Sequence, residues 1–294
     1  MKKFELTTES ITNVAGKKLF RIKALVEFGN VKAGELGGYV EKEGNVSQNG
    51  NAWVYGDARV YGDARVYGDA RVYGNAWVSG AAWVHGNAKV RGNAEVYGDA
   101  EVSGDALVYG NAKVSDNVRV SDNAKVCGNA EVYGDAEVSG DARVYGDAEV
   151  YGDAEVYGNA KVSDNVRVHG NAWVHGNAEV YGDAEVSGDA WVYGDAKVSG
   201  DAWVCGNAKV SDNAEVYGDA DYALVKGFGT EFRCTTFYRD KNKKIMVNCG
   251  CFHGDLEAFR KQVKETRSGK IAKEYLLIAD LMEYHFTSED SSNE

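Results

Sequence analysis

The chain has 294 residues, 36 glycines, no proline and a formal net charge of −12. Residues 38–221 hold 14 Lys+Arg against 30 Asp+Glu, so the acidic excess lies there and nucleic acid is not expected as a partner. No apolar run has membrane-spanning length and the first residues lack the apolar core of a signal peptide, which argues against a membrane location. The five cysteines form no disulfide framework and favour a reducing cytoplasm.

Residues 1–37 precede the repeats and are predicted to cap them. The stretch LFRIKALVEF at residues 19–28 has strand-like segments, and Gly29-Asn30 offers a turn. A cap is expected because the end of a repeat array exposes unpaired backbone groups and needs an atypical unit.

Residues 38–221 are dominated by a six-residue repeat. Every sixth residue from Val54 to Val216 is valine, at 28 positions without a miss. Alanine stands two residues before each valine, except at Val118 and Val166, and glycine or the triplet SDN marks the corner. Alternation puts alanine and valine on one buried side, and Gly-Asp or Gly-Asn turns the chain. The repeat therefore predicts three-sided coils of 18 residues, about ten in all.

The unit V-x-G-(N/D)-A-x resembles the hexapeptide signature of left-handed parallel β-helix proteins. That resemblance implies left-handed winding, an exception to the usual right-handed crossover. LFRIKALVEF, VKAG at 31–34 and LGGYVE at 36–41 resemble the opening segment of hexapeptide proteins of bacteriophages and bacteria, some of them labelled transferases or polymer-forming proteins. VNCGCF at 247–252 resembles the end domain of such phage proteins. The predicted fold is a left-handed parallel β-helix with a small C-terminal α+β domain.

Residues 222–294 are predicted to form that α+β domain, with a loose acidic tail from Thr287 to Glu294. Phe232–Tyr238 and Ile245–Cys251 suggest a hairpin around residues 240–244. Two helices should follow, the first opening near Asp255, and their apolar stripes are Leu256, Phe259 and Val263, then Ile271, Tyr275, Ile278 and Met282. Besides capping the coils, the apolar helix faces of this domain are candidates for assembling subunits.

An 18-residue period places the outward side chains on three faces. We number the faces in the order in which the chain reaches them from Trp53 on. The first face begins with Trp53 and Tyr55 and is mainly basic; its candidate binding residues are Arg71, Lys89, Arg91, Lys125 and Arg143. The third face carries the candidate aromatic clusters Trp83 and His85, then Trp173, His175, Trp191 and Tyr193. Such aromatics can anchor a protein partner, or they can simply stack between neighbouring strands.

Many hexapeptide proteins are acyltransferases, for which the resemblance implies a trimer, an acyl-coenzyme A cleft between subunits and a histidine general base. The candidates for that base here are His85, His169 and His175, none of which has a distinctive local partner in the sequence. The 28 repeats contain no insertion that could cover a cleft. Acyl transfer is therefore an alternative hypothesis.

Cys249, Cys251 and His253, with Cys234 across the predicted hairpin, are of the types that bind zinc. Their spacing lacks the usual C-x₂-C pair, so a reduced structural cluster is favoured, and neither a metal nor a cofactor is expected.

The sequence thus predicts a non-enzymatic, phage-type rigid scaffold that binds a protein partner through its acidic or Trp-rich faces. A sharper version is a nucleic-acid mimic or anti-host factor, acting in the host cytoplasm if the chain is phage-encoded. A homo-oligomer, trimer or dimer, is also expected. The alternatives are a hexapeptide acyltransferase at a subunit interface, a polymer-forming protein and a small-ligand-binding protein.

Overall fold

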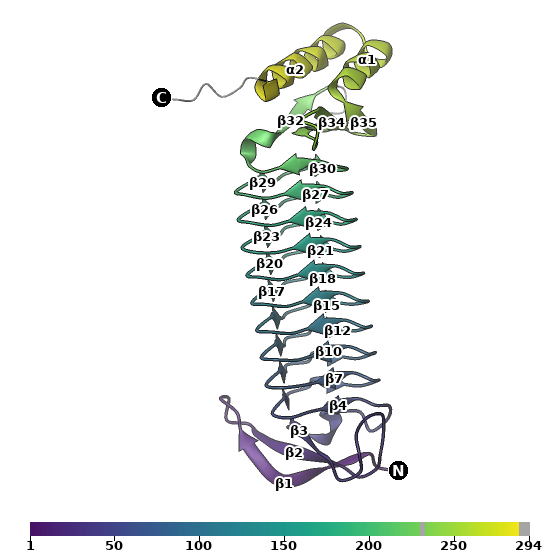
Figure 1. Ribbon diagram of the computed structural model, residues 1–294, viewed down its shortest axis with the longest axis vertical. Helices are drawn as coiled ribbons and strands as arrows, with labels where there is room; N and C mark the ends of the chain where they lie inside the picture. The colour runs from purple at the N-terminus through teal and green to yellow at the C-terminus, as the bar shows by residue number, and fades with distance from the viewer. Residues whose placement is uncertain (230–232, 288–294) are drawn as a thin grey trace. The chain divides into compact units, whose positions relative to one another are not determined.

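The computed structural model describes residues 1–229 and 233–287, which belong to two compact units, Met1–Asn165 and Val166–Glu294. The first unit is built mainly from a parallel β-solenoid, and the second unit contains further coils, about ten in all, followed by a small domain of antiparallel strands and two helices (Figure 1). This confirms the predicted fold class. The predicted acidic tail, from residue 288 on, and the start of the predicted hairpin at Phe232 lie outside the described residues.

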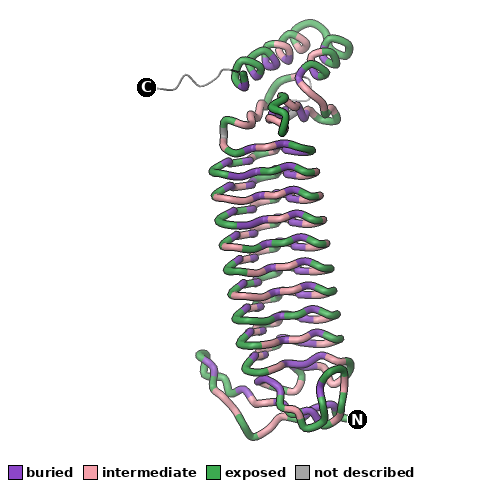
Figure 2. Tube along the Cα trace, in the orientation of Figure 1, coloured by how far each residue is buried: buried purple, intermediate pink, exposed green. Residues whose placement is uncertain are grey.

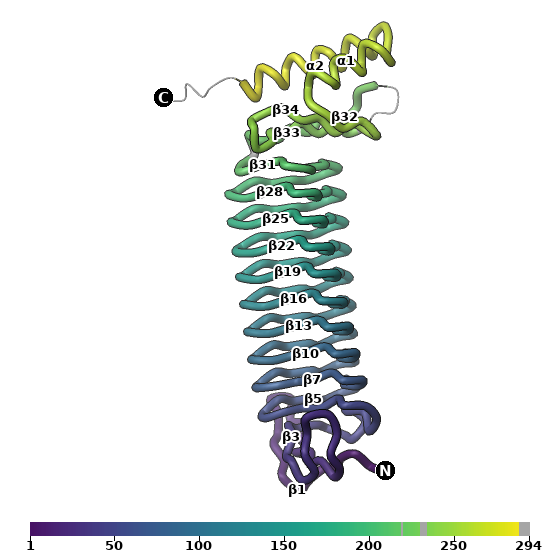
Figure 3. The backbone as a smooth tube through the Cα atoms, turned by 45° about the vertical axis from the view of Figure 1, so that its right-hand side comes forward, coloured from purple at the N-terminus to yellow at the C-terminus, as the bar shows by residue number. Residues whose placement is uncertain are grey.

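The coils consist of short strands joined by tight corners. Strands β4 to β31 each contain two residues, a variable residue and the repeat valine, from Trp53–Val54 (β4) to Glu215–Val216 (β31). Partners lie 18 residues apart, so Lys89 pairs with Arg71 on one side and Leu107 on the other. The alanine and valine of each repeat are fully buried, so buried and more exposed positions alternate along the coils (Figure 2), and within each unit successive coils stack on one another (Figure 3).

The corners explain the recurrent glycine. Gly86 has a φ of +66°, and a Cβ on it would lie 2.9 Å from both the backbone N and O of Gly104 in the next coil. A side chain there is therefore excluded by the close stacking of the coils as well as by the left-handed backbone. In the SDN triplets Asp116 adopts the same conformation, with a φ of 59°, and its carboxylate accepts a 3.1 Å hydrogen bond from the amide of Gly134.

The first coils are closed by an N-terminal antiparallel sheet. Its strands are β1 (Phe4–Thr12), β2 (Lys18–Ala24) and β3 (Leu36–Val40), and β3 also pairs in parallel with β5 (Arg59–Val60). Sequence analysis did not predict β1. The prediction that Trp53 faces outward is wrong, because the indole is fully buried and packs edge-on against Phe4 and Phe28 at ring distances of 5.8 and 5.3 Å.

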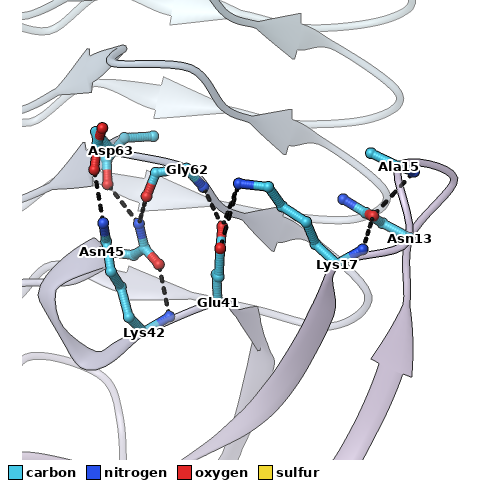
Figure 4. Close-up of polar contacts among 9 residues, drawn as sticks. Asn13, Ala15, Lys17, Glu41, Lys42, Asn45, Gly62 and Asp63 are labelled. Carbon is cyan, nitrogen blue, oxygen red and sulfur yellow. Dashed lines mark hydrogen bonds and ion pairs between the residues drawn. The ribbon is translucent and has the colours of Figure 1, made fainter.

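Polar side chains complete this cap where a preceding coil would otherwise lie (Figure 4). The Glu41 carboxylate accepts hydrogen bonds from the Gly62 amide at 2.6 Å and from Lys17 at 3.1 Å. The Gly62 bond, followed by the charge of Lys17, holds the pKa of Glu41 below its usual value. Asn45, in the short 3-10 helix η1 (Glu43–Asn45), donates from Nδ2 to the carbonyls of Gly62 and Ala64 at 3.1 and 2.8 Å. These side chains thus satisfy the amide and carbonyl of Gly62 and the carbonyl of Ala64.

The C-terminal domain begins after a second 3-10 helix, η2 (Asp219–Asp221), and contains four antiparallel strands and two helices. These elements are β32 (Tyr222–Phe228), β33 (Arg233–Arg239), β34 (Ile245–Cys249), β35 (Phe252–Asp255), α1 (Leu256–Thr266) and α2 (Gly269–Thr287). The described part of the predicted hairpin is confirmed as β33 and β34, whereas β32 and β35 were not predicted. Asp255 caps α1 by accepting from the Ala258 amide at 2.8 Å.

Both predicted apolar stripes face the core of this domain. Leu256, Phe259 and Val263 of α1 are buried, and so are Tyr275, Ile278 and Met282 of α2, with Ile271 partly buried against the same core; these lie with Phe237 and Val247 of the sheet. The sheet also takes the place of a further coil, since the amide of Lys209 donates to the Thr236 hydroxyl at 2.9 Å.

Candidate binding site on the third face

An aromatic groove opens on the third face of the first unit. It lies where β6 (Arg65–Val66) pairs with β9 (Trp83–Val84). The Tyr67 ring stacks on His85 with centroids 4.7 Å apart and meets Trp83 edge-on at 6.2 Å. The Trp83 side chain remains 45% exposed. The groove has a volume of about 280 Å³ and is lined by Gly44, Ser47, Arg65, Val66, Tyr67 and Trp83.

The groove exists because small residues precede these aromatics. Val46 bridges to Val66, and the amide of Ser47 donates to the Val66 carbonyl at 2.8 Å, so Ser47 occupies the position one coil before Tyr67. A Cβ on Gly44 would have no atom within 4 Å. A large side chain at either position would cover the ring edges, whereas serine and glycine leave them open.

Two of the predicted histidines have an acidic partner in the next coil. His85 Nε2 lies 2.6 Å from Oε1 of Glu101, which belongs to β12 (Glu101–Val102). His169 lies 3.0 Å from Glu185 in the same way. Sequence analysis found no local partner for these histidines, and each partner seen here is 16 residues away in sequence and is brought close only by the coil. Burial, followed by the charge of Glu101, raises the pKa of Tyr67.

An acidic groove adjoins the aromatic groove along the same ladder of strands. It has a volume of about 490 Å³ and is lined by Asp99, Glu101, Asn117, Arg119, Asp135 and Glu137. Arg119, in β15 (Arg119–Val120), pairs with Glu101 on one side and with Glu137, in β18 (Glu137–Val138), on the other. Four carboxylates thus surround one guanidinium, and the groove carries a net negative charge. Glu155 follows Glu137 in the ladder, and its pKa is raised by burial and then by Glu137.

The second aromatic cluster, in the second unit, is packed differently. Trp173, in β24 (Trp173–Val174), stacks on Trp191, in β27 (Trp191–Val192), with ring centroids 4.8 Å apart and planes at 10°. His175 stacks on Tyr193 at 5.2 Å. Lys209 lies over the Trp191 ring at 4.3 Å, a cation–π contact. Burial lowers the pKa of His175.

The basic candidates of the first face share one ladder of the first unit. Lys89 follows Arg71, and Arg143 follows Lys125, each one coil later. The guanidinium of Arg91 lies over the Tyr109 ring at 4.8 Å, and Tyr55 stacks on Tyr73 with centroids 4.7 Å apart. These residues line up as predicted, interleaved with stacked tyrosines.

The cysteine and histidine candidates of the C-terminal domain have separate contacts. Cys234 lies 3.6 Å from the Asn207 amide oxygen, and Cys249 lies 3.1 Å from the Thr235 hydroxyl. His253 contacts the carboxylate of Asp212 at 2.7 Å, and Cys251 is exposed. Within residues 1–229 and 233–287, no three His, Cys, Asp or Glu side chains gather as a metal site would require.

The repeat matches a known family over part of the chain. The family model described as YdcK Beta solenoid repeat matches residues 52–68, 58–72, 70–86 and 160–176. Together with the coils of the structure, these matches support a β-solenoid repeat protein. A search of the curated proteins found no match. Neither of the two helices in the part of the chain that the structure describes has the length and apolar character needed to cross a membrane.

Proposed function

We propose that this protein is a rigid scaffold and that the third face of its first unit binds an extended basic segment of a protein partner. The observation that carries the proposal is the shared position of Glu101, which contacts His85 beside the aromatic groove and lines the acidic groove. An apolar anchor of the partner would pack on the exposed Trp83 ring, and its lysine or arginine side chains would pair with the carboxylates beyond. Aromatic anchors of this kind dominate many protein interfaces.

The dimensions of the two grooves suit a short peptide. From Arg65 to Glu137 the ladder runs over four coil-to-coil steps, each about 4.8 Å, which gives about 19 Å. An extended chain spans about 3.3 Å per residue, so about six residues would cover both grooves. The coils are held by backbone hydrogen bonds on every strand, so the surface is formed before the partner arrives and little ordering cost falls on the scaffold.

The corners favour a peptide over mimicry of nucleic acid. At one corner Asn75, Asn93, Asn111 and Asn129 form a ladder of side-chain hydrogen bonds, at 3.2, 3.0 and 2.9 Å. A mimic of a nucleic-acid strand needs a regular row of negative charges, and this corner is neutral over four successive coils. The carboxylates of the acidic groove, in contrast, lie around Arg119 and form no unbroken row of negative charge.

The resemblance to phage and bacterial hexapeptide proteins supports a host protein as the partner. The scaffold would then act by occupying a surface of that protein that normally receives a basic segment. From the same resemblance we also propose that the coils wind in the left-handed sense.

Acyl transfer is the second candidate, and the His85–Glu101 contact of 2.6 Å is the observation that favours it. A carboxylate that orients an imidazole is a common arrangement for a general base. Titration with acetyl-coenzyme A, followed by calorimetry, tests this candidate directly. Saturable heat that is lost in His85→Gln would support it, and the absence of heat would eliminate it.

A library of random displayed hexapeptides, panned on the full-length protein, tests the scaffold proposal. We expect enrichment of peptides with one large apolar residue and two or more lysines or arginines. The affinity of the enriched peptide should fall several-fold in Glu137→Gln and stay unchanged in Glu95→Gln, which lies on another ladder of the same unit, between Trp77 and Lys113. Enrichment without basic residues, or equal loss in both variants, would overturn the proposal.

A further inference from the structure

The first unit contains a ladder of five strands whose outward residues are four cations and a leucine. We call it the basic ladder, and its strands are β7 (Arg71–Val72), β10 (Lys89–Val90), β13 (Leu107–Val108), β16 (Lys125–Val126) and β19 (Arg143–Val144). Successive strands pair in parallel, and Figure 3 shows them one above another. The outward residues therefore follow one another at steps of about 4.8 Å.

The positive charge of the basic ladder is not neutralised by ion pairs. On another ladder of the same unit, Lys113 lies 2.7 Å from the carboxylate of Glu131. Within residues 1–229 and 233–287, no carboxylate lies within ion-pair distance of the ladder cations Arg71, Lys89, Lys125 and Arg143. Asp69, at the corner before the first strand, accepts instead from the Asn51 amide at 2.8 Å. The ladder thus presents cations that are free to pair with an incoming anion.

The corner that follows these strands is uncharged over most of the ladder. After the first four strands it consists of the hydrogen-bonded side chains of Asn75, Asn93, Asn111 and Asn129. Arg91 lies between the ladder and this corner, where it adds a fifth cation and stands over the Tyr109 ring at 4.8 Å. An anion that approaches from this side meets cations and neutral amides, and no carboxylate of the corner repels it.

Leu107 divides the ladder cations into two pairs. Arg71 and Lys89 precede it and Lys125 and Arg143 follow it, so the centre of each pair lies about 7 Å from the leucine along the ladder. The leucine itself is partly exposed. An extended peptide presents every second side chain on the same side, at intervals of about 6.6 Å. The two spacings match closely enough for one carboxylate to lie between the two cations of each pair.

We propose that the basic ladder binds an extended acidic segment of a protein. The segment has the pattern acidic-x-apolar-x-acidic, where x is any residue, and its apolar side chain packs on Leu107. Each acidic side chain then lies between two cations of the ladder. This surface is separate from the two grooves of the third face, so the inference does not depend on the function proposed above.

Two features favour a peptide over a nucleic acid or another uniform polyanion. A uniform row of anionic groups would place one of them against Leu107, where the ladder has no cation to compensate for the loss of water. Bases would also need open aromatic faces on which to stack. Here Tyr73 is stacked on Tyr55 with centroids 4.7 Å apart, and the Arg91 guanidinium lies over Tyr109.

Calorimetric titration of the full-length protein with the capped peptide Ser-Glu-Ser-Leu-Ser-Glu-Ser tests the inference. The salt concentration should be on the order of 0.05 M, where exposed charges are screened less than at physiological ionic strength. We expect saturable binding, and about fivefold weaker binding of the isomer Glu-Glu-Ser-Leu-Ser-Ser-Ser, which cannot reach both pairs of cations. No binding, or equal binding of the two peptides, would overturn the inference. Tighter binding of a thymidine trinucleotide, which carries the same two negative charges, would overturn it in favour of a nucleic acid.

Substitutions along the ladder test where the peptide binds. Leu107→Glu places a carboxylate between the two pairs and should abolish binding. Lys89→Gln and Arg143→Gln, at two exposed positions, should each weaken binding about fivefold. Lys113→Gln is the matched control, because it removes a cation that is already paired with Glu131 and should leave binding unchanged.

The two exchanges of exposed cations decide the matter if Leu107→Glu fails to fold, as judged by circular dichroism. An equal loss in Lys113→Gln and in Arg143→Gln would show that the peptide responds only to the net charge of the protein. That result, or full binding in both ladder variants, would overturn the inference.

Discussion

The two aromatic clusters of the third face use the same residue types in different ways. Around Trp173 and Trp191 the rings lie flat on one another, with centroids 4.8 Å apart, and Lys209 covers the outer ring. Around Trp83 the contact with Tyr67 is edge-on at 6.2 Å, and the indole is 45% exposed above a groove. Around Trp173 and Trp191 the ring faces are therefore in contact with neighbours within the solenoid. Around Trp83 part of the indole remains available to a partner.

The neighbouring coil decides which arrangement forms. Trp191 has another tryptophan, Trp173, one coil before it and Lys209 one coil after it. Trp83 has Arg65 before it and Glu101 after it, and Ser47 stands one coil before the neighbouring Tyr67. A tryptophan that has another tryptophan one coil before it becomes part of the stacked ladder, whereas a tryptophan between two charged side chains remains a surface feature. Both clusters look alike in the sequence until the 18-residue neighbours are compared.

Truncation of the two tryptophans should separate binding from stacking most strongly. Trp83→Ala should weaken the enriched basic peptide about thirtyfold, the effect of losing a central aromatic anchor. Trp191→Ala should leave the affinity unchanged, since that ring is covered. Fluorescence anisotropy of the labelled peptide measures both variants. Equal losses in the two variants would show that the peptide does not distinguish the clusters.

Filling the groove should make the cluster around Trp83 resemble the covered cluster around Trp173 and Trp191. Ser47→Trp places a large ring one coil before Tyr67, where it can stack on the Tyr67 ring and cover it. We expect about tenfold weaker peptide binding with no loss of solenoid stability, because Ser47 is only partly buried and makes no core contact. Asn49→Trp, at an exposed position two residues away, is the control. Binding that survives Ser47→Trp at full strength would exclude the groove as the binding site.

The cluster around Trp173 and Trp191 should contribute to stability, whereas the cluster around Trp83 should contribute to binding. Trp191→Ala should lower the local free energy of opening in the second unit by about 1 kcal/mol, the scale of one aromatic pair beyond its buried area. Hydrogen exchange of the amides of Trp173 and Lys209, which lie on either side of Trp191, measures this locally, as a repeat array requires. Trp83→Ala should change the exchange of its own neighbours less. The interpretation of the second cluster as structural fails if both substitutions affect exchange equally.

The solenoid could be predicted from the sequence because its determinants are local. One valine every six residues fixes the buried side, and glycine or SDN fixes each corner, so the 18-residue pairing of Lys89 with Arg71 follows. The end regions were predicted less completely. The burial of Trp53 depends on Phe4 and Phe28, which come from outside the repeats and have no fixed period with it.

The candidate site was predicted only in part, for a related reason. Trp83 and His85 were recognised as outward residues, but the groove depends on the absence of side-chain volume at Gly44 and Ser47, where the repeat is still irregular. The contact between His85 and Glu101 could have been predicted. A separation of 16 residues places Glu101 in the next coil, two residues before the position directly opposite His85. Applying the coil period to charged pairs, as well as to aromatic ones, would have revealed it.

The smallest expected effect is an acid sensitivity confined to the second cluster. Burial lowers the pKa of His175 in the folded protein below its ordinary value of 6.5, so the unfolded chain binds the proton more readily. Well above pH 6.5 His175 is neutral in both states and does not lower the stability of the folded protein. Stability is lost as the pH falls through 6.5 toward the lower pKa of the folded state. His175→Phe keeps a flat ring against Tyr193 and removes the proton-binding site. The stability difference between variant and wild type, measured by amide exchange near Tyr193, should therefore shift in favour of the variant between pH 7.5 and pH 5, a range of about two units around the ordinary histidine pKa. A difference that stays constant over this range would mean that the stacked imidazole accepts its proton as easily as a free one, and that the second cluster is more open to solvent than its ring contacts indicate.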